Sequence, residues 1–137
     1  MSDLVVHYEG GLRCHVTHPD NGAVLVMDAP QDLNGRGEGF SPSDLLSVSL
    51  GGCVLSIMAM AGRVAGLELA GATATVTKEM GNAPRRITTL GVTVRVPGRY
   101  DAAQRRRLTA AADACPVHAV LGLSLIHISE PTRPLYI

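Results

Sequence analysis

The middle of the chain contains a long run without a charged side chain, residues 45–62, and any fold must place this run away from water or inside a membrane. The run is long enough to span a bilayer. It nevertheless contains three serines and three glycines, and no aromatic belt or basic cluster marks one flank. We therefore expect a helix of a soluble protein that is buried on most sides, for example at a subunit interface, and no membrane partner.

Composition places the chain among small soluble proteins. Its 137 residues fit one domain, and 46% of them are hydrophobic, which is enough to build a core. Twelve basic residues balance twelve acidic ones, and there is no Trp and only one Phe, so we expect no nucleic-acid partner. The first residues lack the basic segment of an export signal, and the three cysteines are an odd number, so a cytoplasmic location is expected.

The first forty residues are predicted to form a small antiparallel meander. Residues 4–8, 12–17 and 23–28 are rich in β-forming side chains, and the Pro-Asp-Asn-Gly turn signal at 19–22 separates the last two. The glycine-rich stretch 30–39 is expected to be a mobile loop.

A helix start follows this loop. Ser41 can cap the helix, Pro42 suits its first position, and Asp44 can close a capping box. The helix is expected to continue to about residue 65 and to end at Gly66. This helix contains the uncharged run, so we expect it to be buried on most sides.

Two adjacent glycines, Gly51 and Gly52, lie in the middle of this helix. Each costs about 1 kcal/mol relative to alanine in a helix interior. Glycines retained at that cost usually allow a close backbone approach, so we expect another element to cross the helix there.

The second half is predicted to contain two strands and a helix. The strands cover residues 72–78 and 87–96, and Asp101 can cap a helix over 102–114. A short further helical piece is expected at 116–121. The order is three strands, one long helix, two strands and one helix, which indicates an α+β fold and not an alternating parallel one.

Residues 123–137 differ in character from the rest of the chain. They resemble the in-frame translation of a transposon-type sequencing-library adapter, with 123–133 as its fixed part. We therefore expect this tail to be non-native and exclude it from the fold prediction, which leaves a single domain at 1–122 without its native C-terminus. The alternative is a genuine C-terminal strand, because residues 123–128 are rich in β-forming side chains.

Cys53 and Cys115 are the candidate reactive groups. An ordinary thiol has a pKa of about 8.5, so only about 3% of it is thiolate at pH 7. Cys53 lies in the apolar helix, where burial disfavours the thiolate unless a cation or a hydrogen-bond donor reaches it. Cys115 directly precedes Pro116 at the expected start of the short helix, where a helix N-terminus would lower its pKa. Without such help, both side chains are small hydrophobes.

A metal site is a competing interpretation of the same residues. Cys115 and His118 have the spacing of metal ligands, and the possible partner ligands are Cys53, Cys14, His15 and His18. The chain has no CxxC pair, and His118 lies on an apolar helical segment, where a structural role is the plainer interpretation. We therefore expect no metal.

Two segments resemble motifs of the OsmC/Ohr-like superfamily, which comprises osmotically inducible protein C and the organic hydroperoxide resistance proteins. The segment GEGFSPSDLLSVSLGGCVLSIM, which contains Cys53, is similar to the signature helix of that superfamily. The segment AADACPVHAVL, which contains Cys115, is similar to its second cysteine motif. The resemblance extends over about residues 8–121.

The resemblance implies an intertwined homodimer in which two wrapped sheets bury the long central helices. It also implies thiol-dependent reduction of organic hydroperoxides. Cys53 would be the peroxidatic cysteine that becomes a sulfenic acid, and Cys115 would be the resolving cysteine that forms an intramolecular disulfide. An external dithiol, such as a lipoylated protein, would reduce this disulfide, and no bound cofactor is implied.

The resemblance assigns two further roles. Members of the superfamily use an arginine of the N-terminal sheet to stabilise the thiolate and an acid just before the cysteine helix to hold that arginine. Arg13 best matches the arginine, and Asp44 stands where peroxidase members usually have Glu. Residue chemistry offers plainer roles, an exposed strand residue for Arg13 and a helix cap for Asp44. The alternative function is a dimer that binds a small apolar molecule or senses oxidants without efficient turnover.

Overall fold

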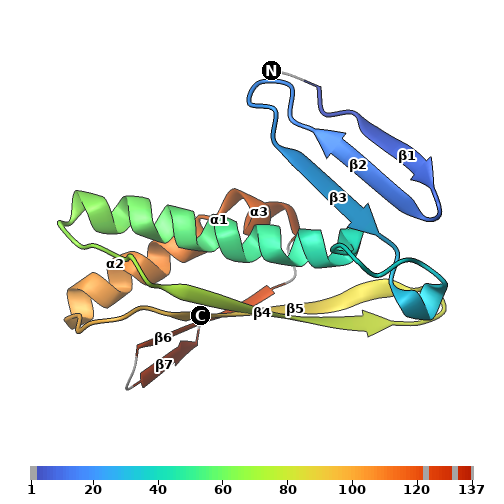
Figure 1. Ribbon diagram of the computed structural model, residues 1–137. Helices are drawn as coiled ribbons and strands as arrows, with labels where there is room; N and C mark the ends of the chain where they lie inside the picture. Colours follow the sequence, from blue (N-terminus) through green and yellow to red (C-terminus); the bar gives the residue numbers. More distant parts are fainter. Residues whose placement is uncertain (1–2, 122–123, 131–132, 137) are drawn as a thin grey trace. The chain divides into compact units, whose positions relative to one another are not determined.

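A computed structural model describes residues 3–121, 124–130 and 133–136 of the chain (Figure 1). The chain divides into two compact units, Met1–Leu46 and Ser47–Ile137, which we describe one at a time. The order of the elements confirms the α+β fold class predicted from the sequence. The assignment of residues 1–122 to a single domain stays a prediction.

The first unit contains a three-stranded antiparallel sheet. Its strands are β1 (Val6–Gly10), β2 (Arg13–Thr17) and β3 (Val24–Asp28), in that spatial order. These strands confirm the predicted meander, with ends that differ by one or two residues. The stretch that was expected to be a mobile loop includes one turn of 3-10 helix, η1 (Gln31–Leu33).

Helix α1 (Pro42–Val64) begins and ends where the sequence predicts. The Ser41 hydroxyl accepts the backbone N–H of Asp44 at 3.1 Å, and an Asp44 carboxylate oxygen accepts the N–H of Ser41 at 3.3 Å. These reciprocal bonds form the predicted capping box. At the other end, Gly66 has a φ of 75°, the left-handed conformation that terminates helices.

In the second unit, α1 lies along one face of the hairpin formed by β4 (Thr73–Gly81) and β5 (Arg86–Arg95) (Figure 1). A Cβ atom added at Gly51 would lie 2.8 Å from Val76 Cγ2, which is too close for a normal carbon contact. The predicted close crossing is therefore confirmed at Gly51, and the crossing element is β4. At Gly52 the prediction is wrong, because an added Cβ would meet nothing within 4 Å.

The core of the second unit combines α1, β5 and the second helix. Side chains from these elements are fully or almost fully buried: Leu50, Val54, Met58, Leu90, Val92, Val94, Leu108 and Ala112. Val96, directly after β5, is buried with them. Helix α2 (Ala102–Asp113) starts with a capping box in which Asp101 and Gln104 exchange hydrogen bonds of 2.8 and 2.9 Å. The short helix α3 (Pro116–Leu121) follows, as the sequence predicts.

Two strands lie in the segment that we excluded from the fold prediction. β6 (Ser124–Glu130) pairs in parallel with β5, and β7 (Arg133–Tyr136) pairs antiparallel with β6. The backbone of this segment thus follows the alternative of a C-terminal strand. Its origin as a translated adapter stays a prediction, because a β-prone sequence can pair with an open sheet edge whatever its source.

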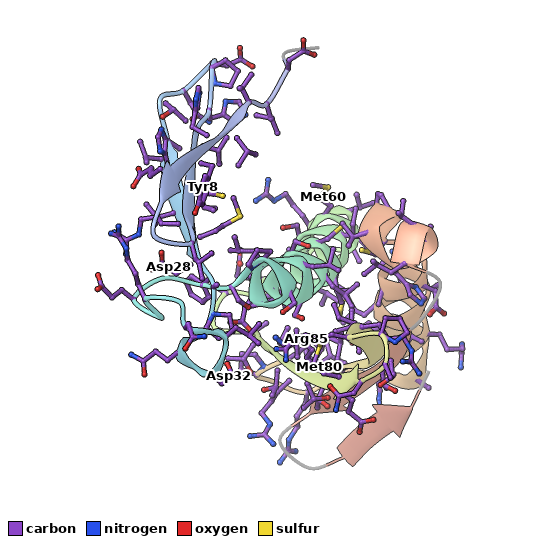
Figure 2. The ribbon with its side chains drawn as sticks, turned by 90° about the vertical axis from the view of Figure 1, so that its right-hand side faces the viewer. Tyr8, Asp28, Asp32, Met60, Met80 and Arg85 are labelled. Carbon is purple, nitrogen blue, oxygen red and sulfur yellow. The ribbon has the colours of Figure 1, made fainter. Side chains whose placement is uncertain are left out.

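Helix α1 is long and apolar enough to cross a membrane by length and composition. Its inner side packs in the core of the second unit, as a core helix of a soluble protein does. Its other side stays open to solvent in the single chain: Met60, labelled in Figure 2, is 62% exposed and Val64 is 86% exposed. The single chain therefore does not bury α1 on most sides, although the sequence led us to expect such burial.

Candidate thiol site

Cys53 and Cys115 lie next to each other in the second unit. Cys53 is half-buried on α1 and packs against the core cluster to which Cys115 belongs. Cys115 lies at the junction of α2 and α3 and is fully buried, with 0% of its surface exposed. Cys53 is near enough to raise the pKa of the Cys115 thiol, and both residues are free thiols. The fold therefore brings together the two cysteines that the sequence singled out.

The environment of Cys115 favours its neutral thiol. Burial raises the pKa of the Cys115 thiol, and the neighbouring Cys53 raises it further. Two backbone N–H groups at the start of α3 act in the opposite direction, and that of His118 donates to Cys115 Sγ at 3.5 Å. The expectation that the start of this helix would lower the pKa is therefore wrong in its net direction, because desolvation is the larger effect.

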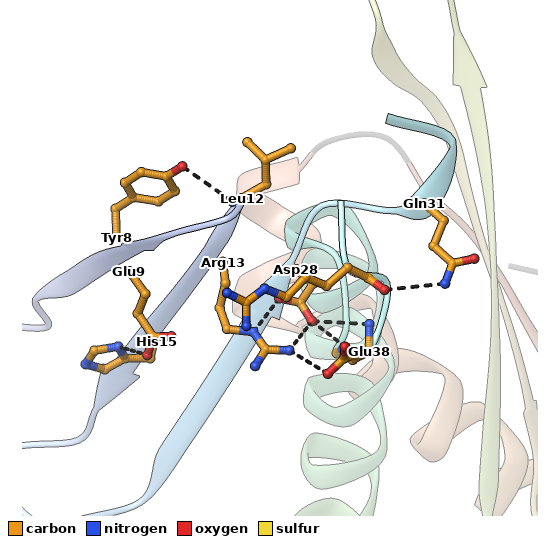
Figure 3. A network of polar contacts seen from close by, with 10 residues as sticks. Tyr8, Glu9, Leu12, Arg13, His15, Asp28, Gln31 and Glu38 are labelled. Carbon is orange, nitrogen blue, oxygen red and sulfur yellow. Dashed lines mark hydrogen bonds and ion pairs between the residues drawn. The ribbon is translucent and has the colours of Figure 1, made fainter. Parts of the chain in front are cut away.

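Arg13 is held by two carboxylates in the first unit (Figure 3). Its Nε and Nη2 atoms donate to the two oxygens of Asp28 at 2.7 and 2.8 Å, a bidentate pair. Nη2 also donates to Glu38 at 3.2 Å. Arg13 is thus not the freely exposed strand residue that residue chemistry suggested.

Asp28 is the centre of this network. Its side chain is fully buried, and besides Arg13 it accepts the backbone N–H groups of Glu38 at 3.2 Å and Gly39 at 2.8 Å. The hydrogen bonds from Arg13 are the main reason that the pKa of Asp28 falls to about 2. One buried carboxylate therefore fixes both the arginine and the segment that leads into α1.

Asp44 has the position that its capping role requires, beside Ser41. The carboxylates that hold Arg13 are Asp28 and Glu38. The roles assigned by resemblance to Arg13 and Asp44, thiolate stabiliser and arginine partner, stay predictions.

Sequence reasoning missed Asp28, although the signal was present. The predicted hairpin turn at 19–22 is centred between Asp20 and Asn21, and an antiparallel register about that point places Arg13 opposite Asp28. Two oppositely charged residues at paired positions of a strand pair are a known stabilising arrangement. The register alone would therefore have identified the pair.

The metal interpretation has no support in the described residues. Among residues 3–121, 124–130 and 133–136, no three His, Cys, Asp or Glu side chains gather in a way that could hold an ion. The contact between Cys115 and His118 uses the histidine backbone N–H.

Structures of known proteins resemble this one closely. A protein of Psychrobacter arcticus 273-4 named for osmotic stress induction and a detoxification response has a TM-score of 0.89 and 32% identity, over 94% of this chain and 96% of that one. Two organic hydroperoxide resistance proteins share the fold at lower identity. The Legionella pneumophila protein (TM-score 0.67) is 21% identical over 95% of this chain and 97% of its own. The Elizabethkingia anophelis protein (TM-score 0.70) is 19% identical over 97% of this chain and 98% of its own.

No curated protein sequence matches the chain. A family model described as OsmC-like protein matches residues 35–129, a range that contains both Cys53 and Cys115. This range is more than half of the chain. The chain therefore belongs to the OsmC-like protein family.

Proposed function

We propose that this protein reduces organic hydroperoxides through a two-cysteine cycle. The observation that carries the proposal is the neighbouring pair of free thiols, Cys53 and Cys115, one half-buried and the other fully buried. The names of the Legionella and Elizabethkingia neighbours support the substrate class, since both are organic hydroperoxide resistance proteins.

The cycle has three steps. The Cys53 thiolate attacks the peroxide, its sulfur gains one oxygen to become a sulfenic acid, and the leaving alkoxide takes a proton to become an alcohol. The Cys115 sulfur then bonds to the Cys53 sulfur, and water leaves. An external dithiol, such as a lipoylated protein, attacks the disulfide, returns both cysteines to thiols and is itself oxidised to a disulfide.

The polar network of the first unit supports a role for Arg13 in this cycle. A guanidinium within about 4–6 Å favours a thiolate, and Asp28 fixes the guanidinium of Arg13 through two short hydrogen bonds. We propose that Arg13 is the thiolate stabiliser and that Asp28, more than Asp44, holds it in place. In this proposal Asp44 acts as the cap of α1.

We also propose that the protein acts as a cytoplasmic homodimer without a nucleic-acid or membrane partner. Two apolar surfaces are open in the single chain. On the sheet of the first unit, Val6 is 54% and Tyr8 is 66% exposed, and on α1 the exposed side contains Met60 and Val64. Sedimentation velocity should give a species of twice the 14.3 kDa chain mass, and a monomer at micromolar concentration would contradict the dimer.

A non-catalytic function in the same family is the second candidate. An apolar hollow of about 390 Å³ in the first unit, lined by Val6, Tyr8, Leu12, Cys14 and Met27 among others, has the size of a small-molecule site. A protein that binds an apolar molecule there, or that only senses oxidants, would be oxidised once and would not be recycled by any dithiol. Sustained turnover would exclude this function.

The first test is the intact mass of the reduced protein after it is mixed with one equivalent of cumene hydroperoxide. The peroxidase proposal expects a loss of about two mass units and a peptide map that joins Cys53 to Cys115, because disulfide formation removes two hydrogens. A Cys53→Ser variant should consume no hydroperoxide with a dithiol present, whereas Cys14→Ser should behave like the parent protein. Unchanged turnover in Cys53→Ser would refute the assignment.

A further inference from the structure

The imidazole of His118 contains a buried nitrogen that the fold does not use. His118 Nδ1 is shielded from solvent, and within the part of the chain that the structure describes it makes no hydrogen bond. Buried polar atoms are almost always hydrogen-bonded, because leaving one without a partner destabilises the folded state. This nitrogen, in the short helix that follows Cys115, is therefore a candidate for a chemical role.

Local geometry places His118 beside the sulfur of Cys115. The backbone N–H of His118 donates to Cys115 Sγ at 3.5 Å, so Cys115 caps α3 and His118 is the third residue of that helix. Side chains in a helix tilt toward its N-terminus, and the third residue is the one whose side chain can reach back to the cap residue. The backbone N–H and carbonyl of Cys115 are already bonded to Ala112 and Ala119, so the thiol is the group of Cys115 that the imidazole can serve.

The core-facing side of α3 carries His118 as well. Val117 and Leu121 pack against the core cluster that contains Cys115, and Cys53 packs against the same cluster from α1. His118 is half-buried between them, one turn before Leu121 on the helix surface.

We infer that His118 is the general base of the resolving step, which takes the proton of the Cys115 thiol and delivers it to the departing hydroxyl. This inference rests on the proposed function and adds a residue to it. The Cys115 thiol needs such a group, because burial raises its pKa and a neutral thiol is a poor nucleophile. Histidine is the side chain that most often takes up and returns a proton near neutral pH.

Atoms and electrons balance in this step. Cys53 enters as a sulfenic acid and Cys115 as a thiol, whose proton moves to His118 Nδ1. The Cys115 sulfur supplies the electron pair of the new S–S bond, and the pair of the broken S–O bond leaves with the hydroxyl. The hydroxyl takes the proton from Nδ1 and departs as water, so His118 ends the step as it began it and no further reactant is needed.

The test separates the two steps of oxidation. In a Cys14→Ser background, reduced protein is mixed with one equivalent of cumene hydroperoxide, quenched with acid at successive times and measured by intact mass. A gain of about 16 mass units reports the sulfenic acid, and a loss of about two reports the disulfide. We expect His118→Asn, which keeps a polar group but is no base, to form the sulfenic acid at the parent rate and the disulfide about 100-fold more slowly.

Rescue by free imidazole distinguishes a base from a structural residue. His118→Ala leaves space for the added imidazole, which should restore the rate of disulfide formation. Val117→Ala is the matched control, because it also removes side-chain atoms from the inner side of α3. Its disulfide should form without the sulfenic acid accumulating, and imidazole should not change that rate.

Disulfide formation at the parent rate in His118→Asn and His118→Ala would overturn the inference. A slow His118→Ala protein that imidazole does not accelerate would equally overturn it, because a purely structural histidine predicts that result. If His118→Ala does not fold, His118→Asn decides alone by the presence or absence of accumulated sulfenic acid. A parent protein that never joins Cys53 to Cys115 would refute the proposed function itself, whereas a parent that forms this disulfide no faster than its His118 variants refutes the inference only.

Discussion

The two glycines in the middle of α1 offer a matched pair for testing how the helix packs. Gly51 and Gly52 are adjacent in one helix, so their replacement by alanine gains the same helix propensity, about 1 kcal/mol. An added Cβ at Gly52 meets nothing within 4 Å, so Gly52→Ala should stabilise the protein by about that amount. At Gly51 the same atom would lie 2.8 Å from Val76 Cγ2 and 3.5 Å from Ala74 Cβ.

The contact with Val76 decides the sign at Gly51. Carbon atoms in normal contact are about 3.5–4.0 Å apart, so the methyl group of Val76 must move, and valine has few rotamers that would allow it. Overpacking of this kind costs about 1–3 kcal/mol. The gain in helix propensity offsets part of this cost, so Gly51→Ala should change the free energy of unfolding by about 0 to −2 kcal/mol. The Gly51→Ala protein should therefore be about 1–3 kcal/mol less stable than the Gly52→Ala protein.

Urea denaturation followed by far-ultraviolet circular dichroism measures these differences at a fixed protein concentration, and it suits a chain without tryptophan. The decisive variant is Gly51→Ala combined with Val76→Ala. The two substitutions should couple favourably by about 1–3 kcal/mol. Val76→Ala removes the methyl group that the new Cβ would clash with, and the new Cβ fills part of the space that the lost methyl groups leave. Equal stabilisation by both single alanine variants, or no coupling with Val76→Ala, would refute the packing of α1 on β4.

Three further predictions concern other parts of the molecule. The pKa of Asp28 falls from 3.8 to about 2 in the folded protein, so its pair with Arg13 stabilises the fold above pH 3.8 and loses this effect as the pH falls toward 2. The melting temperature of the parent should therefore drop more steeply over that interval than that of Asp28→Asn, and parallel curves would contradict the pair. Asp101→Ala should lower the free energy of unfolding by about 1 kcal/mol, because it removes the cap of α2, whereas Asp113→Ala at the other end should not. Asp44→Ala should cost a similar amount in urea denaturation if the residue acts as a cap, and an additional rise in the pKa of Cys53 would instead favour its assignment as the arginine partner.

Local signals were enough to predict most of the secondary structure. The cap at Ser41 and Asp44, the cap at Asp101 and the stop at Gly66 involve residues within a few positions of one another, so the sequence pattern contains the whole interaction. The hairpin turn at 19–22 is equally local, and it sets the register of β2 and β3. The candidate cysteines were also identifiable, through two motifs that the family shares.

The properties that give these residues a chemistry depend on contacts between distant parts of the chain. Gly51 and Gly52 are equivalent in the sequence, and only the path of β4 distinguishes the crowded position from the open one. A local rule predicted a lowered pKa for Cys115, yet its burial beside Cys53 raises the pKa, because desolvation depends on everything packed around the sulfur. The sequence alone determined where the helices begin and end, since those signals act over one or two turns. Tertiary packing raised the pKa of the Cys115 thiol and determined which carboxylates hold Arg13, since burial and charge pairing are properties of the folded chain.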